Sequence, residues 1–182
     1  MAGYANDVAQ LATDLIEENA QNILINNLPN LGLVPGVTAG PLAFAAGWAE
    51  ELTIAFNDAL WDALATVTGA NIFLLDAFSL TENIINDVTL NPDPLTNGWG
   101  LSNVTDACFV QTDPNSGFSG GPGTTCANPD EYLFWDGLHP TDAGHTLIAN
   151  FAYGAVVPVP AALPLLLSAL LGLGAAKRAR KA

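Results

Sequence analysis

The first 176 residues of this 182-residue chain contain no lysine and no arginine, although the chain has 18 acidic residues. All four basic residues lie among the last six positions, and the formal net charge is -14. A domain with many carboxylates and no cation is repelled by a phosphate backbone, so we exclude nucleic acid as a partner. Because 50% of the residues are hydrophobic and only 12% are charged, the chain is expected to fold rather than remain disordered.

Cysteine is also scarce, since the chain has only Cys108 and Cys126, both within a segment rich in small and polar residues. Two cysteines with no histidine beside them make a poor metal site, and we expect neither a metal nor a cofactor. A disulfide would stabilise this loop by roughly 3 kcal/mol and would imply an oxidising compartment. Two unpaired thiols are the alternative. We favour the disulfide, because such a loop has little other means of staying ordered.

The two chain ends disagree about export. The first residues have neither the basic region nor the apolar region of a signal peptide. At the other end, an Ala/Leu-rich run over residues 161–176 is followed by the basic cluster, which predicts a transmembrane helix with a cytoplasmic anchor. A buried core helix is the alternative. A tail that needs export, joined to a head without an export signal, suggests that an N-terminal portion is missing.

The apolar pattern of residues 1–153 predicts an α/β domain. Tyr4, Val8, Leu11 and Leu15 follow helical spacing, and a buried strand is expected at residues 22–28. A long helix should begin at Pro41 and stop near Gly69, with Trp48, Leu52, Leu60 and Leu64 among its apolar stripe, before a second strand at residues 72–78. Strand, helix and strand in this order predict a parallel pair.

The second half of the domain is less regular. Residues 79–82 have the form of a capping box that opens a short helix. Residues 88–131 are expected to be mostly loop, followed by a short apolar segment at 132–135 and a last helix from Pro140 or Thr141 to about Phe151. Two parallel strands are too few for a stable sheet, so missing strands or a partner chain are expected.

The residues best suited to chemistry are His139 and Asp136, because an Asp three residues before a His can orient the imidazole and stabilise its charged form. A helix starting close to His139 would keep the ring neutral and ready to act as a base. An incidental hydrogen bond at a helix terminus is the alternative. His145, the other histidine, is expected to pack or face solvent, and Asp76 is expected to cap a helix or lie in a loop.

Residues 136–141, Asp-Gly-Leu-His-Pro-Thr, closely resemble the last sequence block of the GDSL-type esterases and lipases, the SGNH hydrolases. Residues 26–35 resemble that family's Asn-Leu-Pro stretch, and residues 75–80 its last core strand. Residues 100–108 and 126–135 resemble the Cys-bearing loop of its bacterial members. The similarity covers about residues 5–153 and implies a three-layer α/β/α, flavodoxin-like fold whose first strands are missing here.

The resemblance also implies serine-esterase chemistry on acyl esters, with His139 as general base and Asp136 orienting it. However, the sequence has no Gly-Asp-Ser-Leu-like block, and Asn6-Asp7 lies on a helical stripe rather than in the family's oxyanion block. We therefore expect the C-terminal part of an ester or lipid hydrolase, inactive alone. The alternative is a non-catalytic surface or matrix protein that retains the fold and tail.

Ser119 offers a competing nucleophile, because residues 117–121 match the G-x-S-x-G pattern of α/β hydrolases. That motif requires a strand before it and a helix after it. Here proline and polar residues flank it on both sides within the expected disulfide loop, which favours a surface turn.

The C-terminal segment, residues 154–182, contains Val-Pro-Val-Pro-Ala, an apolar span and the basic cluster. This order resembles the PEP-CTERM sorting signals of Gram-negative bacteria in their VPxPA-type variant. The resemblance implies export, temporary retention in the inner membrane, cleavage by an exosortase-type protease, and delivery to the cell surface or extracellular matrix. A plain C-terminal anchor is the alternative.

Overall fold

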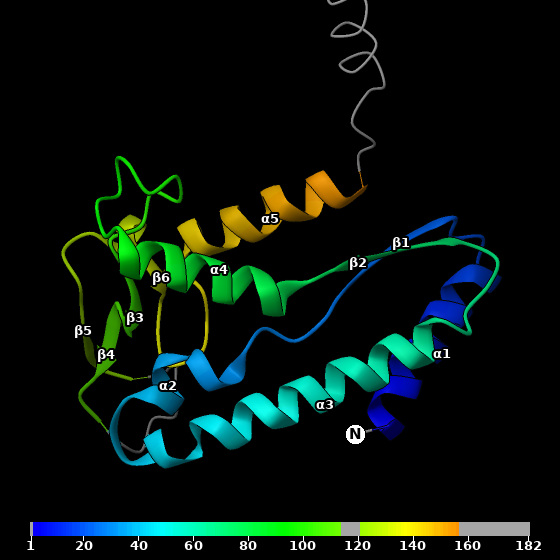
Figure 1. Cartoon of the computed structure of the whole chain (residues 1–182), viewed down its shortest axis with the longest axis horizontal. Coiled ribbons are helices and arrows are strands. Elements are labelled where there is room, and N and C mark those ends of the chain that lie inside the picture. Colours follow the sequence, from blue (N-terminus) through cyan, green and yellow to red (C-terminus); the bar gives the residue numbers. More distant parts are fainter. Residues whose placement is uncertain (1, 114–120, 157–182) are drawn as a thin grey trace, which may run out of the picture.

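The computed structural model describes residues 2–113 and 121–156, and its α/β fold confirms the expected class. Helix α1 (Ala2–Glu17) is followed by strand β1 (Asn22–Asn26), helix α3 (Ala46–Leu64) and strand β2 (Asn71–Leu75). The two strands pair in parallel, from Asn22 opposite Asn71 to Asn26 opposite Leu75. The predicted strand–helix–strand unit is therefore present, with helices on both sides of the strand pair (Figure 1).

Side chains that alternate along the strands build the first of two cores. Ile23 and Ile25 of β1, with Ile72 and Leu74 of β2, belong to the cluster formed with α1 and α3. Of these four, Ile23 is buried and the others are partly buried, and the remaining buried members are small or aliphatic: Ala5, Ala9, Ala12, Leu60, Ala63 and Leu64. Because the alanine side chain is small, alanines at helical spacing let the backbone of α1 pack close to α3.

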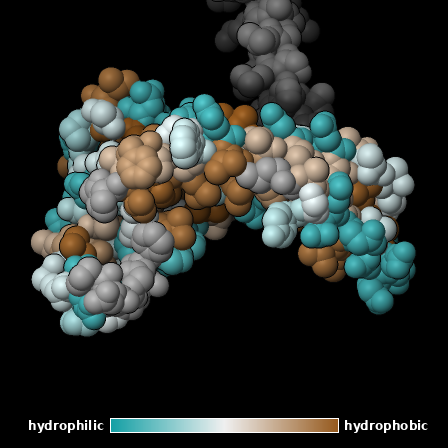
Figure 2. Space-filling model, turned by 90° about the horizontal axis from the view of Figure 1, so that it is seen from below, coloured by the Kyte–Doolittle hydropathy of each residue, from teal (hydrophilic) through white to brown (hydrophobic). Residues whose placement is uncertain are grey.

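This packing confirms part of the predicted faces and corrects the rest, since Leu60 and Leu64 of α3 are buried and Val8 of α1 packs against the core as predicted. Tyr4, Leu11 and Leu15 are at least half exposed on α1, and Trp48 and Leu52 are exposed on α3. The alanines bury the opposite side of α1, and α3 turns polar Thr53 and Asn57 inward instead. Asn57 donates its amide to the Leu28 carbonyl and accepts from the Leu28 N–H, both at 2.9 Å. Apolar surface consequently remains visible from the side of α1 and α3 (Figure 2).

Element boundaries also differ from prediction. Residues Gly40–Ala45 form a 3-10 helix, η2, so α3 begins at Ala46 rather than Pro41 and ends at Leu64 rather than near Gly69. Helix α4 (Ala77–Leu90) begins two residues before the predicted capping box. Asp76 is its N-cap, because the Asp76 carboxylate accepts the Ser79 N–H at 3.1 Å. The capping role expected for Asp76 is thus confirmed.

The region expected to be mostly loop contains three additional strands. Strand β3 (Asn103–Ala107) pairs in parallel with β6 (Tyr132–Phe134), and β4 (Phe109–Gln111) pairs antiparallel with β5 (Gly123–Thr125). The remaining short elements are η1 (Leu31–Leu33) and α2 (Pro35–Thr38), which lie between β1 and η2, and η3 (Pro129–Glu131), which lies between β5 and β6. Helix α5 (Asp142–Val156) completes the described chain and extends past the predicted end at Phe151.

A second core joins these elements beside the first. Its buried members come from the junction of η1 and α2, from α4, from the loop before β3, and from strands β3 and β6: Val34, Leu80, Ile84, Val88, Leu101, Val104, Leu133 and Phe134. Cys108 and Cys126 form the predicted disulfide, which ties the start of β4 to the end of β5. Across the two described ranges, no helix combines the length and apolar character that crossing a bilayer requires. The predicted span at residues 161–176 lies outside the described residues.

Candidate active site

The turn between β6 and α5 carries Asp136 and His139. Its two sides are tied together, because the Trp135 N–H donates to the His139 carbonyl at 2.7 Å and Phe134 forms an antiparallel bridge with Pro140. Thr141 then caps α5 by accepting the Gly144 N–H at 3.0 Å. The turn is therefore fixed at its strand end and at its helix end, as a positioned catalytic group requires.

Asp136 is the buried member of the pair, with 1% of its surface exposed. Its Oδ1 accepts the N–H groups of Leu138 and His139, both at 2.8 Å. These two donors replace water around the carboxylate and allow its charge to be buried. The sequence produces this locally, because an Asp side chain readily accepts from N–H groups two and three residues later in a turn.

The His139 ring lies against this carboxylate, with Nδ1 at 2.9 Å from Oδ2 and 3.0 Å from Oδ1 of Asp136. An ionised carboxylate can only accept, so a neutral imidazole in this position holds its proton on Nδ1 and has its lone pair on Nε2. The side chain of His139 is 53% exposed, and within the described residues Nε2 makes no hydrogen bond. The arrangement therefore presents a base at the surface. Since α5 begins at Asp142, His139 precedes that helix by three residues.

Helix α2 supports the turn from a distant part of the sequence. The Gly36 N–H donates to the Gly137 carbonyl at 2.7 Å. Gly36 follows Pro35 at the start of α2, where N–H groups have no partner within the helix. Upstream of it, buried Asn30 accepts the Gly32 N–H and donates to Glu82. The sequence pattern did not reveal this support, although the stretch 26–35 that resembles the family contains Asn30 and ends one residue before Gly36.

The disulfide segment holds the other side of the turn. The Cys108 N–H donates to the Phe134 carbonyl at 3.0 Å, and the Phe109 N–H donates to the Trp135 carbonyl at 2.6 Å. The rings of Phe109 and Trp135 stack with centroids 5.6 Å apart. The disulfide thus lies directly beside the strand that leads to Asp136, which links loop stability to the geometry of the pair.

No serine hydroxyl in the described ranges contacts His139. Ser79 donates to Asp76 at 2.7 Å and Ser102 donates to Glu131 at 2.8 Å. Ser119 lies outside the described residues. His145 is exposed on the first turns of α5, which is one of the two placements predicted for it. The structure therefore brings together Asp136 and His139 but gives them no nucleophile among the residues it describes.

A second polar cluster lies where β1 and β2 end. Buried Asn27 donates to the Asp76 carboxylate at 2.9 Å and accepts the Phe78 N–H at 3.1 Å. Partial burial raises the pKa of Asp76, but the hydrogen bonds from Ser79, Asn27 and Phe78 outweigh it and hold the pKa below its ordinary value. The cluster joins β1 to α4, and we assign it to structure.

A parallel α/β scaffold that presents a carboxylate-oriented histidine where a strand ends is an arrangement typical of hydrolases. Residues 1–152 match the model of the GDSL-like lipase/acylhydrolase family, and the chain belongs to that family. Esterase EstA of Pseudomonas aeruginosa is 31% identical over 135 residues, which cover 74% of this chain and 19% of that protein. A GDSL esterase/lipase of Arabidopsis thaliana is 27% identical over 146 residues, which cover 75% and 38%. The chain thus spans less than half the length of these curated relatives.

Proposed function

We propose that this chain supplies the general base and its orienting carboxylate for the hydrolysis of carboxylic esters by a serine nucleophile. The observation that carries the proposal is the buried Asp136 carboxylate, held by two backbone N–H groups, with Nδ1 of His139 at 2.9 Å. Membership of the GDSL-like lipase/acylhydrolase family supports the ester class.

In the proposed reaction, Nε2 of His139 takes the proton of a serine hydroxyl as the oxygen forms a bond to the ester carbonyl carbon. Asp136 stabilises the resulting imidazolium. The imidazolium then gives its proton to the departing alcohol as the carbon–oxygen bond of the ester breaks. Water releases the acyl group from serine by the same two steps, so that one ester and one water give one acid and one alcohol.

We further propose that the serine comes from polypeptide outside these 182 residues. The chain has no Gly-Asp-Ser-Leu-like block, and its described serines donate to Asp76 and Glu131 rather than to His139. The short coverage of the relatives' length agrees with this proposal. Residues 154–182 are proposed as the sorting and anchoring segment of an exported protein, which pulse-chase fractionation of membrane and medium would test.

Labelling with a fluorophosphonate, which reacts with activated serines, tests the proposal. The 182-residue chain should remain unlabelled, including at Ser119. When the chain is joined in frame to the serine-bearing segment expected upstream, one serine of that segment should be labelled. His139→Ala should slow this labelling at least about 10²-fold, whereas His145→Ala should not. Labelling of Ser119, or labelling that is indifferent to His139, would refute the proposal. An upstream stop codon would favour the non-catalytic surface protein.

A further inference from the structure

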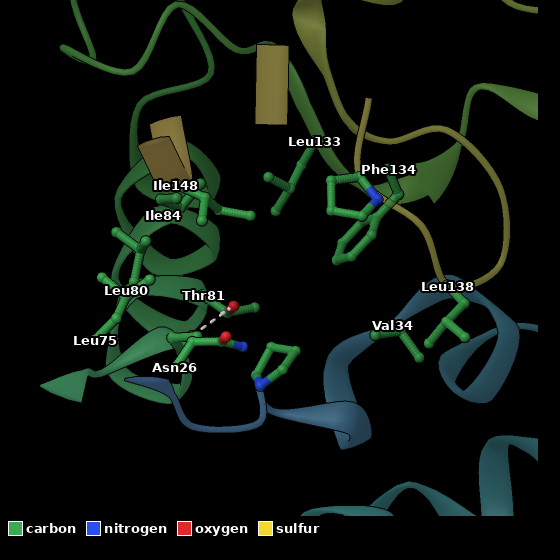
Figure 3. A pocket seen from close by; sticks show the side chains of 13 residues that line it. Asn26, Val34, Leu75, Leu80, Thr81, Ile84, Leu133, Phe134, Leu138 and Ile148 are labelled. Atoms are coloured by element: carbon green, nitrogen blue, oxygen red, sulfur yellow. Dashed lines mark hydrogen bonds between the residues drawn. The ribbon is translucent and has the colours of Figure 1, made fainter. Parts of the chain in front are cut away.

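A cavity of about 200 Å³ lies beside the turn that carries His139 (Figure 3). All but two of its 13 lining residues are apolar, and the exceptions are Asn26 and Thr81. Figure 3 shows Leu133, Ile84 and Ile148 at one end of the cavity and Leu138 with Val34 on the side of the turn. The cavity is therefore a defined apolar space that the proposed acid–base chemistry does not use.

The cavity lies next to the proposed active site. Leu138 and Pro140, the two neighbours of His139 in the chain, both line it. Asn26 and Leu75, which line it from the other side, are the last residues of the parallel strands β1 and β2. Ligands of α/β proteins commonly bind at the carboxyl ends of parallel strands. A group held here would thus lie next to the turn that presents Nε2.

The residues that line the cavity determine which kind of ligand can bind there. No charged residue lines the cavity, and the Thr81 hydroxyl is already used, since it donates to the Ala77 carbonyl at 2.8 Å. A charged group would lose its hydration here without a partner, and the chain's net charge of -14 disfavours anions in addition. The cavity therefore suits a neutral, apolar group.

The volume sets the size of that group. An apolar cavity of about 150 Å³ in another protein binds benzene, which has six carbons. By this comparison the present cavity holds about six to eight carbons, which is too small for a complete large lipid. We infer that it binds the aliphatic part of the ester substrate, so that medium-chain esters are preferred over acetates. This inference rests on the proposed function, which supplies the ester.

The test measures binding of neutral esters to the 182-residue chain by methyl-resolved NMR. Methyl octanoate places the eight-carbon group on the acyl side, and octyl acetate places it on the alcohol side, so the tighter ligand identifies the source. From butanoate to octanoate, each added methylene should tighten Kd by about fourfold. The methyl signals of Ile84, Ile148 and Leu133 should shift as the ligand binds.

Ala77→Leu fills the cavity from α4 and should weaken binding of the preferred ester by about tenfold or more. Ala55→Leu, the same change at an exposed position of α3, is the matched control and should leave Kd unchanged. Leu138→Ala, at a partly exposed wall residue, should also weaken binding and does not require the core to expand. Binding of neither ester, or equal binding by the unchanged chain and the Ala77→Leu and Leu138→Ala variants, would overturn the inference.

His139→Ala should bind these esters with the same Kd, because the cavity does not use Nε2. The experiments can therefore refute the proposed function and the cavity inference independently of each other. A chain that binds medium-chain esters but never supports serine labelling would refute only the proposed function. A joined protein whose labelling depends on His139 but whose cavity binds no ester would refute only this inference.

Discussion

At the scale of single residues, Asp136 and His139 contribute differently to the molecule. Asp136 is buried and satisfies two backbone N–H groups, whereas the His139 side chain is about half exposed. Asp136 should therefore matter for stability as well as for chemistry. His139 should matter less for stability, because its removal takes one hydrogen bond from Asp136 Oδ2, whereas removal of Asp136 takes the acceptor from two backbone N–H groups and from Nδ1.

Asp136→Ala should lower the free energy of unfolding by about 2–4 kcal/mol, because two backbone N–H groups and Nδ1 of His139 lose their shared acceptor. His139→Ala should lower it less, by about 0.5–1.5 kcal/mol, because it removes one hydrogen bond to a carboxylate that water can then reach. Urea unfolding of both variants, followed by circular dichroism, measures the difference. Equal effects of the two substitutions would show that the pair does not have the geometry described.

Asp76 gives a residue-scale prediction about pH. Its folded pKa lies below its ordinary value, so its ionised form stabilises the fold. This stabilisation is present above the unfolded pKa of about 3.9 and is lost as the pH falls through the lower folded pKa. Asp76→Asn keeps a capping side chain but does not titrate, so the stability difference between wild type and variant should shrink below about pH 4. Asp7→Asn, at an exposed position of α1, controls for the lost charge. A pH-independent difference between wild type and Asp76→Asn would contradict the prediction.

The sequence alone predicted contacts between single residues best where the two partners are close together in the chain. Asp136 and His139 are three residues apart, so turn chemistry was enough to pair them. The Gly36 contact with Gly137 was not predictable in the same way, because it joins residues about a hundred positions apart. Asn27 is a similar case, since its partner Asp76 is 49 residues away.

At the scale of elements, the cap of α5 determines where the helix starts and therefore where the turn before it lies. Buried Thr141 accepts the Gly144 N–H and donates to the Tyr132 carbonyl. Thr141→Val keeps the shape but removes both hydrogen bonds, and it should cost about 1–2 kcal/mol of stability. Thermal unfolding measures this cost, with Thr105→Val at an exposed position of β3 as the control. A cost no larger than that of the control would contradict the assigned cap.

The hydrophobic pattern located the helices and the parallel strand pair, and it placed Leu60 and Leu64 correctly in the core, but it misplaced part of each buried face. In α1 the large apolar residues point outward because alanines allow the closest packing against α3. In α3, Asn57 is buried because it satisfies the backbone of Leu28. Strands β4 and β5 were missed because they have only three residues each and pair through contacts distant in sequence.

At the scale of the whole molecule, nearly all of the charge is negative. Residues 1–176 contain carboxylates but neither lysine nor arginine, so long-range repulsion opposes the folded state. Raising NaCl from about 0.02 M to about 0.3 M shortens the screening length severalfold and should increase the free energy of unfolding. Urea unfolding at constant pH measures the change. A decrease over this range would show that attractive ion pairs dominate instead.

The proposed ester hydrolysis requires that His139 acts as the base for a serine that lies elsewhere in the polypeptide. Hydrolysis of 4-nitrophenyl butyrate tests this directly, with the 182-residue chain alone and joined to its upstream segment. We predict no His139-dependent turnover by the chain alone. The joined protein should turn over the ester, and His139→Ala should lower its kcat/KM by at least about 10²-fold while His145→Ala leaves kcat/KM unchanged. Turnover by the 182 residues alone that disappears with His139→Ala would contradict the account.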